Sequence, residues 1–140
     1  MKTFIPGQIA SAKDVNDNFT ELANAIKNAT TITDAAPTAH AGWALTAPST
    51  VRTSGKTHTL SLSIKRTASG FTSTPGTSFQ LAVLPTTVPA PQDGEIIGAI
   101  QFGAYSAPLK YAANGGLITC HPTAAFAVAQ NGIGLGTATW

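Results

Sequence analysis

Apolar residues recur at alternating steps of three and four between residues 11 and 29 of the chain. Because an α-helix completes a turn about every 3.6 residues, this spacing gathers the apolar side chains into one narrow stripe. The stripe consists of positions a and d of successive heptads, namely Ala12, Val15, Phe19, Leu22, Ile26 and Ala29. Ser11, with Asp14 three residues later, is typical of a helix start. The sequence therefore predicts an amphipathic helix, which ends where the β-branched run of residues 30–33 lowers helix propensity.

A stripe this narrow has two interpretations. The helix could pack on its own domain, or it could form a coiled coil with other copies of the chain. We favour the coiled coil, because a core-facing helix usually adds apolar e or g positions and because no other helix is expected downstream. We expect a parallel homotrimer with Val15, Phe19, Leu22 and Ile26 at its interface. A rod of about 28 Å is marginal alone, so contacts between the following domains must supply further stability.

From Trp43 onward the apolar pattern has a period of two. Apolar and polar residues alternate in 60–65 and in 78–83, which is the pattern of half-buried β-strands. Gly98 inside another such pattern indicates a bulge or a close approach of two backbones. Asn114-Gly115-Gly116 predicts a tight hairpin, because Asn and Gly accept the positive φ of such turns. About seven or eight strands separated by Gly or Pro predict a mainly β domain, an antiparallel β-sandwich of jelly-roll type.

These patterns divide the chain into three parts. Residues 1–34 form an N-terminal segment and helix, residues 35–41 a linker, and residues 42–140 the β-sandwich head. Phe4, Ile5 and Ile9 flank a Pro-Gly turn in a segment too short to fold alone. We expect them to be buried against a partner; folding back on the helix as a hydrophobic staple is the alternative.

The sequence around the helix resembles that of phage fibre proteins. The stretch FIPGQIASAKDVNDNFTELANAI is similar to the opening G-x-x-A-x-A-x-x-V-N-x-N-F of many bacteriophage fibre and minor tail proteins, where it precedes a short helix and a trimeric β domain. The matching residues are Gly7, Ala10, Ala12, Val15, Asn16, Asn18 and Phe19. The resemblance implies that Phe4, Ile5 and Ile9 anchor the protein to a capsid or tail protein of the virion.

A second resemblance covers roughly residues 50–128, with gaps. FQLAVLPTTVPAPQDGEIIGAI and the later YAANGGLITCHP are similar to the L-x-x-L-P-x-x-x-x-P and N-G-x-I-x-V segments of distal domains of phage tail fibres and receptor-binding proteins. Where that family often has Gly-Phe/Tyr-Arg-Pro between its two prolines, this chain has Thr86, Thr87 and Val88. Together the resemblances imply a short virion spike on the tail or, as a head fibre or decoration protein, on the capsid.

Composition and charge narrow the class of protein. Only 10% of residues are charged and 43% are hydrophobic, which argues against disorder. A net charge of +2, with Lys65-Arg66 as the only adjacent basic pair, argues against a nucleic-acid partner. Pro6-Gly7 interrupts the N-terminal apolar residues, and no long apolar run follows, so we expect neither a signal peptide nor a membrane span. The product should stay soluble in the host cytoplasm until it joins a particle. Cys120 is the only cysteine and is expected to be a small buried residue in a strand.

The sequence offers little for catalysis. Asp93 and Glu95 flank a glycine and are most simply turn formers, and no motif of a hydrolase or metalloprotease is present. The histidines His40, His58 and His121 have no ligand spacing, although a trimer would present His58 or His121 three times if that residue lay near the axis. We therefore expect no enzymatic activity, no metal and no cofactor.

Aromatic residues suggest binding instead. Sugar rings stack on aromatic faces while their hydroxyls take hydrogen bonds, and the candidate residues are Tyr105 and Tyr111, followed by Trp140 and Trp43. Core packing is the alternative for each. We expect a homotrimeric virion fibre that contacts a host cell-surface glycan. The alternatives are a non-viral carbohydrate-binding module and a cell-wall-degrading enzyme.

Overall fold

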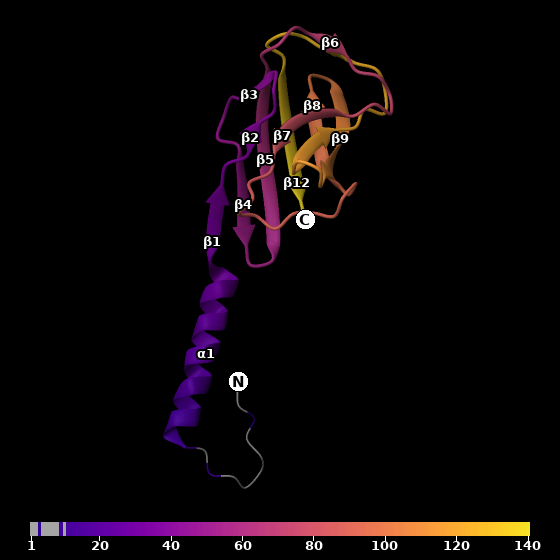
Figure 1. The fold of residues 1–140 in the computed structure, drawn as a ribbon. Coiled ribbons are helices and arrows are strands. Elements are labelled where there is room, and N and C mark those ends of the chain that lie inside the picture. Colours follow the sequence, from indigo (N-terminus) through magenta and orange to yellow (C-terminus); the bar gives the residue numbers. More distant parts are fainter. Residues whose placement is uncertain (1–2, 4–8, 10) are drawn as a thin grey trace.

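A single helix projects from a β-sheet head in the computed structural model, which describes residues 3, 9 and 11–140 (Figure 1). The helix, α1, covers Ala12–Thr30. As predicted, Ser11 caps it: the Asp14 N–H donates to the Ser11 side chain at 3.2 Å. At the other end the Thr31 hydroxyl donates to the carbonyl of Lys27 at 2.7 Å, within the β-branched run.

The apolar stripe of α1 stays open in the single chain. No residue of α1 is buried, and Phe19 is 65% exposed. Leu22 and Ile26 are also exposed, while Val15 is half-buried. The helix therefore does not pack on its own head, and the stripe remains available for a partner.

The strands of the described residues are mostly short. They are β1 (Ile32–Ala35), β2 (Thr38–Ala39), β3 (Trp43–Leu45), β4 (Thr50–Ser54), β5 (Thr57–Arg66), β6 (Phe71–Thr72), β7 (Phe79–Val83), β8 (Ile96–Phe102), β9 (Tyr105–Ala112), β10 (Leu117–Cys120), β11 (Ala127–Val128) and β12 (Ile133–Thr139). The predicted Asn-Gly-Gly hairpin is confirmed between β9 and β10, where Gly115 and Gly116 both have positive φ.

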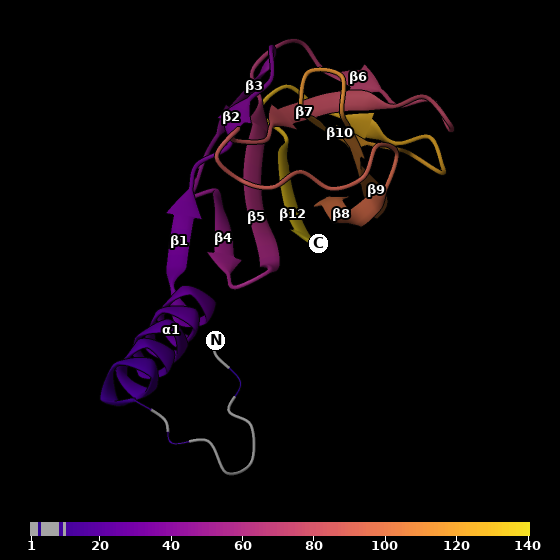
Figure 2. The same cartoon turned by 60° about the horizontal axis from the view of Figure 1, so that its bottom comes forward.

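One continuous antiparallel sheet forms most of the head. Its order is β1-β4-β5-β12-β8-β9-β10-β7-β2, with β3 pairing the far end of β5, and β6 and β11 pair separately. The sheet curls into a half-barrel (Figures 1 and 2). The predicted mainly β, antiparallel head behind an N-terminal helix is thus confirmed, whereas the two stacked sheets of a sandwich are not.

The residues assigned to a linker belong to the sheet in part. Ala35 ends β1, which pairs with β4, and Thr38–Ala39 pair with β7. The β-branched residues before Ala35 favour a strand, but the partners lie far along the chain. Periodicity within residues 35–41 cannot reveal such long-range pairing, because each strand is too short to show a pattern.

The core fills the concave side of the curled sheet. Its largest fully buried side chains include Leu60, Ile64, Leu81, Ile100 and Leu109. Gly98 fulfils both expectations for it, since the register shifts between Ile96 and Gly98 and a Cβ at Gly98 would collide with the Thr137 carbonyl of β12. Cys120 is buried as predicted, and this burial raises the pKa of its thiol to about 12.

Candidate ligand-binding site at the distal end of the head

The end of the head opposite α1 is where the candidate site lies, and we call it the distal end. The C-terminal ends of β5 and β8 meet there with the starts of β9 and β12, as their antiparallel pairing requires. The small β6 and β11 sheet lies at the same end (Figure 1). The α1 helix and this end are therefore separated by the length of the β5 strand.

Aromatic side chains gather at the distal end. The aromatic cluster consists of Trp43, Phe71, Phe79, Phe102, Tyr105 and Phe126. Trp43 stacks on Phe79, with ring centroids 6.0 Å apart, and Phe102 stacks on Phe126 at 5.8 Å. Such contacts fix the rings relative to one another, since each pair adds specific geometry to the burial of apolar area.

Tyr105 is the most exposed member of the aromatic cluster, with 51% of its surface accessible. Its ring stacks on that of Phe126, at 5.5 Å between centroids and 15° between planes. Phe126 is held in turn, because its N–H donates to the buried Ser73 hydroxyl at 3.0 Å and the Ser73 N–H donates back to the Phe126 carbonyl at 2.8 Å. Tyr105 thus presents an accessible aromatic surface on a fixed support.

A groove of about 530 Å³ runs beside this ring, and we call it the Tyr105 groove. Its lining residues are Phe102, Gly103, Ala104, Tyr105, Ala127, Val128, Ala129, Asn131, Gly132 and Ile133. Asn131 has a φ of 65° and is exposed, and its N–H donates to the Arg66 carbonyl at 2.9 Å. The Arg66 N–H donates to the Gly132 carbonyl, also at 2.9 Å. An aromatic ring beside a fixed polar turn is a suitable surface for one sugar ring.

A second groove, the Arg66 groove, has a volume of about 270 Å³. It is lined by His40, Ala41, Trp43, Arg66, Phe71, Phe79 and Gln80. The Arg66 guanidinium carbon lies 5.2 Å from the centroid of Trp43 and 5.1 Å from that of Phe71, which are cation–π distances. The backbone of Arg66 is hydrogen-bonded to Asn131 and Gly132, which line the Tyr105 groove, so the two grooves are connected through these residues.

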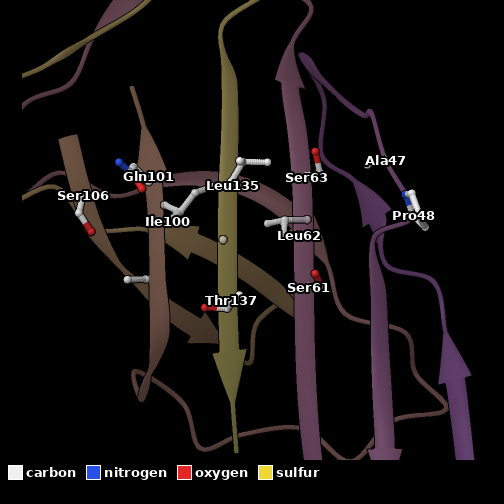
Figure 3. A pocket seen from close by; sticks show the side chains of 12 residues that line it. Ala47, Pro48, Ser61, Leu62, Ser63, Ile100, Gln101, Ser106, Leu135 and Thr137 are labelled. Carbon is white, nitrogen blue, oxygen red and sulfur yellow. The ribbon is translucent and has the colours of Figure 1, made fainter. Parts of the chain in front are cut away.

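A third and larger groove, of about 600 Å³, lies on the outer face of the sheet (Figure 3). The hydroxyls of Ser61 and Ser63 on β5 and of Thr137 on β12 line it, beside the 61% exposed Leu135. Gln101 and Ser106 close its far side. No charged or aromatic side chain lines this groove, so it offers less chemistry for recognition than the distal end.

The structure separates the two tyrosines proposed from the sequence. Tyr105 begins β9 and is accessible, whereas Tyr111, near its other end, is 7% exposed and belongs to the core. Six residues of strand span about 20 Å. The assignment of Tyr111 to ligand binding is therefore wrong, and core packing explains it. Trp43 is also buried, and the Trp140 indole N–H donates to the carbonyl of Pro89 at 2.8 Å.

Part of the proposed virion anchor can be located. Ile9 is 95% exposed, so it is not stapled to the helix in the single chain. Phe4 and Ile5 lie outside the described residues.

Four residues of the distal end were not predicted from the sequence as part of a site. The sequence places Phe126 in a short strand over residues 125–129, but its stacking under Tyr105 is a long-range contact that the pattern does not reveal. In the sequence Arg66 stands out only as half of a basic pair, and its position at the end of a long strand is the signal that marks it. Asn131-Gly132 is an Asn-Gly turn immediately before an apolar strand, which marks a hairpin-like reversal.

The polar residues considered for catalysis form hydrogen bonds within the head. Asp93 accepts from the Ala113 N–H at 2.8 Å, and Glu95 accepts from the Gln92 N–H at 2.9 Å. His121 shares a 2.7 Å hydrogen bond with the Ser78 hydroxyl. Among the described residues, no three His, Cys, Asp or Glu side chains come together as a metal site requires. No helix in the same part of the chain combines the length and hydropathy needed to cross a membrane.

The same architecture occurs in a phage protein of known structure. The chain is similar to the crystal structure of the receptor binding protein (gp15) of Listeria phage PSA, with a TM-score of 0.53 and 16% sequence identity. The similarity covers 94% of this chain and 80% of that chain. At this identity the likeness establishes a shared fold. No protein-family model and no curated protein matches the sequence.

Proposed function

We propose that the chain is a bacteriophage virion protein that attaches the particle to its host cell. Its fold is similar to that of a phage receptor binding protein, and its N-terminal sequence resembles that of phage fibre proteins. The helix and the distal end of the head lie at opposite ends of the molecule (Figure 1). Residues of the distal end line the Tyr105 groove and the Arg66 groove. This polarity suits a short spike whose N-terminus faces the tail or capsid and whose distal end faces the cell.

The spike is a homotrimer in this proposal. An unpartnered stripe with Phe19, Leu22 and Ile26 exposed is unfavourable in water, and burial of apolar surface yields about 25 cal/mol per Å². A parallel coiled coil would cover it. Sedimentation equilibrium should give three times the chain mass of 14.2 kDa. A monomer at micromolar concentration would contradict the trimer and favour a monomeric binding module.

The N-terminal residues attach the spike to the virion. Ile9 is fully open in the single chain, and Phe4 and Ile5 share its apolar character. Deleting residues 1–10 should leave a soluble, folded trimer that no longer incorporates into particles. Mutant particles that carry the protein at the wild-type copy number would exclude this role.

The Tyr105 groove contacts a host surface glycan. The observation that carries this proposal is the accessible Tyr105 ring, stacked on the buried Phe126 beside the exposed Asn131 turn. A single sugar site of this kind binds at around millimolar concentration, about −4 kcal/mol, and three sites on one spike raise the apparent affinity through effective concentration.

Cell binding by the purified full chain tests this site. Fluorescent protein should bind host cells, and Tyr105→Ala should reduce binding about tenfold while the melting temperature changes by only a few degrees, since half of the ring is exposed. Leu135→Ala is the matched control, because it removes an equally exposed side chain from the outer sheet face. Equal loss in both variants, or no binding by the wild-type chain, would refute the assignment.

A further inference from the structure

The acidic residues lie away from the distal end, whereas basic residues occur at both ends of the molecule. The six carboxylate residues lie on α1, on β1 or in the loop before β8, and they are Asp14, Asp17, Glu21, Asp34, Asp93 and Glu95. Because β8 begins at the end of the sheet nearer α1, none of the six lies at the distal end. Lys65 and Arg66, by contrast, end β5 there. The distal end is therefore positive in a chain with a net charge of only +2.

Arg66 is positioned but not neutralised. Its Nε donates to the Ser69 carbonyl at 3.1 Å, and its Nη1 donates to the Gly42 carbonyl at 3.4 Å. A guanidinium has five N–H donors, so these two bonds leave donors for a ligand. Among the described residues no carboxylate forms an ion pair with it. The aromatic rings beneath it hold the plane of the group in place.

The groove around Arg66 adds donors of a second kind. His40 and Gln80 are among its lining residues, and their side chains carry an imidazole and an amide. Its volume of about 270 Å³ is small for a complete ligand pocket and suits one charged functional group. A fixed guanidinium fork with other polar side chains beside it is the arrangement that proteins use for carboxylates and phosphates.

We propose that the Arg66 groove is an anion subsite that binds the carboxylate or phosphate group of an acidic surface glycan, while the Tyr105 groove receives an adjacent sugar ring. This inference rests on the proposed attachment role and narrows its ligand to acidic glycans. The backbone bonds from Arg66 to Asn131 and Gly132 keep the two grooves in a fixed relation.

Three sugars that differ in one group test the subsite. The full-length protein, isotopically labelled, is titrated with glucose, glucuronate and glucose 1-phosphate while the NMR signals of the Arg66 Nε–H and the Gln80 amide are followed. Saturable shifts with glucuronate alone identify a carboxylate subsite, those with glucose 1-phosphate alone a phosphate subsite, and shifts with both a general oxyanion subsite. Shifts no larger than those with glucose, or shifts confined to other parts of the molecule, overturn the inference.

Variants then assign the effect to the guanidinium. Arg66→Gln should weaken anion binding at least about tenfold, and Arg66→Lys, which keeps the charge but loses the planar fork, should weaken it less. Lys56→Gln is the matched control, because it removes one positive charge from the β4–β5 turn at the other end of the sheet. Unchanged anion affinity in folded Arg66→Lys and Arg66→Gln would overturn the inference. Should Arg66→Gln fail to fold, the wild-type titration and Arg66→Lys still decide.

The outcomes also separate this inference from the attachment role. Cell binding that is reduced by Tyr105→Ala but is not inhibited by glucuronate or glucose 1-phosphate would overturn the anion subsite and leave the attachment role intact. If the wild-type chain bound neither host cells nor either anion, both the attachment role and the anion subsite would be refuted.

Discussion

The guanidinium of Arg52 on β4 donates two parallel hydrogen bonds to the carboxylate of Asp34 on β1, from Nε to Oδ1 at 2.9 Å and from Nη2 to Oδ2 at 3.0 Å. The two residues are directly opposite in the register of the strands. Because β1 is an edge strand that continues from α1, this pair fastens the first strand of the head to the sheet. A bidentate bond between a guanidinium and a carboxylate is stronger than a hydrogen bond between neutral groups, so it supplements the backbone pairing of β1 with β4.

The pair should make stability depend on pH. The hydrogen bonds from Arg52 hold the pKa of Asp34 below its ordinary value. A depressed folded-state pKa means that the stabilisation is complete above the unfolded value of about 3.9 and is lost as the pH falls through the lower folded value. When the pH is lowered below about 4, the urea midpoint of the wild-type chain should therefore decrease. The midpoint of Asp34→Asn should decrease less.

Asp17→Asn is the control, since it removes a carboxylate from an exposed helical pair with Lys13 and leaves the head unchanged. If all three proteins lost stability equally between neutral pH and pH 3, the pair would have no part in the acid response.

A charged residue in the apolar stripe of α1 should dissociate the proposed trimer into single chains. Phe19→Asp places a carboxylate at an a position, which a coiled coil buries. The Phe19 side chain is largely exposed in the single chain, so the head itself should still fold. The variant should be lighter by light scattering and still show the near-ultraviolet spectrum of a folded head. Asn24→Asp, off the stripe, should keep the wild-type mass. A trimer that survives Phe19→Asp would place the interface elsewhere.

Close approach of β8 and β12 should make Gly98 intolerant of a side chain. A Cβ there would meet the Thr137 carbonyl and the Ala138 Cα, which belong to backbone and cannot rotate away. We expect Gly98→Ala to cost about 1–3 kcal/mol in the free energy of unfolding. Gly136→Ala, whose nearest atoms would be 3.2 Å away or farther, should cost less. Chemical denaturation measures both, and a reversed order would show that the two strands separate easily.

The support beneath Tyr105 should matter for binding. Ser73→Ala leaves the N–H of buried Phe126 without its partner, at a cost of about 1–3 kcal/mol, and frees Phe126 to shift under the Tyr105 ring. Cell binding should fall even though Ser73 is itself buried and cannot touch a ligand. Ser63→Ala on the outer sheet face is the control. Unaltered binding in a folded Ser73→Ala variant would show that Tyr105 needs no fixed support.

The Cys120 thiol should be inert in the folded protein. Its burial raises its pKa to about 12, so almost no thiolate exists at pH 8, and no reagent reaches it. A thiol-reactive dye should label it only after denaturation. Rapid labelling of native protein at pH 8 would reveal local opening of β10.

Local patterns in the sequence predicted the helix and most of the longer strands, because a period of 3.6 or two is visible within a single element. The order of the strands in the curled sheet was not predictable in this way. The pairing of Thr38–Ala39 with β7 depends on residues more than forty positions away, and β2 is too short to carry a period. Tyr105 and Tyr111 were equivalent as sequence, since both are odd positions of one strand; their burial differs because Tyr111 lies over the core and Tyr105 at its margin.

The place of β12 within the sheet has a consequence for biosynthesis. This last strand pairs with β5 on one side and β8 on the other, so it joins two groups of strands that otherwise share no edge. A nascent chain that has not yet released residues 133–139 from the ribosome holds two partial sheets with unpaired edges between them. Closing them requires contacts over a long sequence separation, which fold slowly. In the proposed trimer, neighbouring chains would be able to associate through α1, which precedes the head in the sequence, before their heads are complete. Unpaired strand edges held close together in this way favour the exchange of strands between chains.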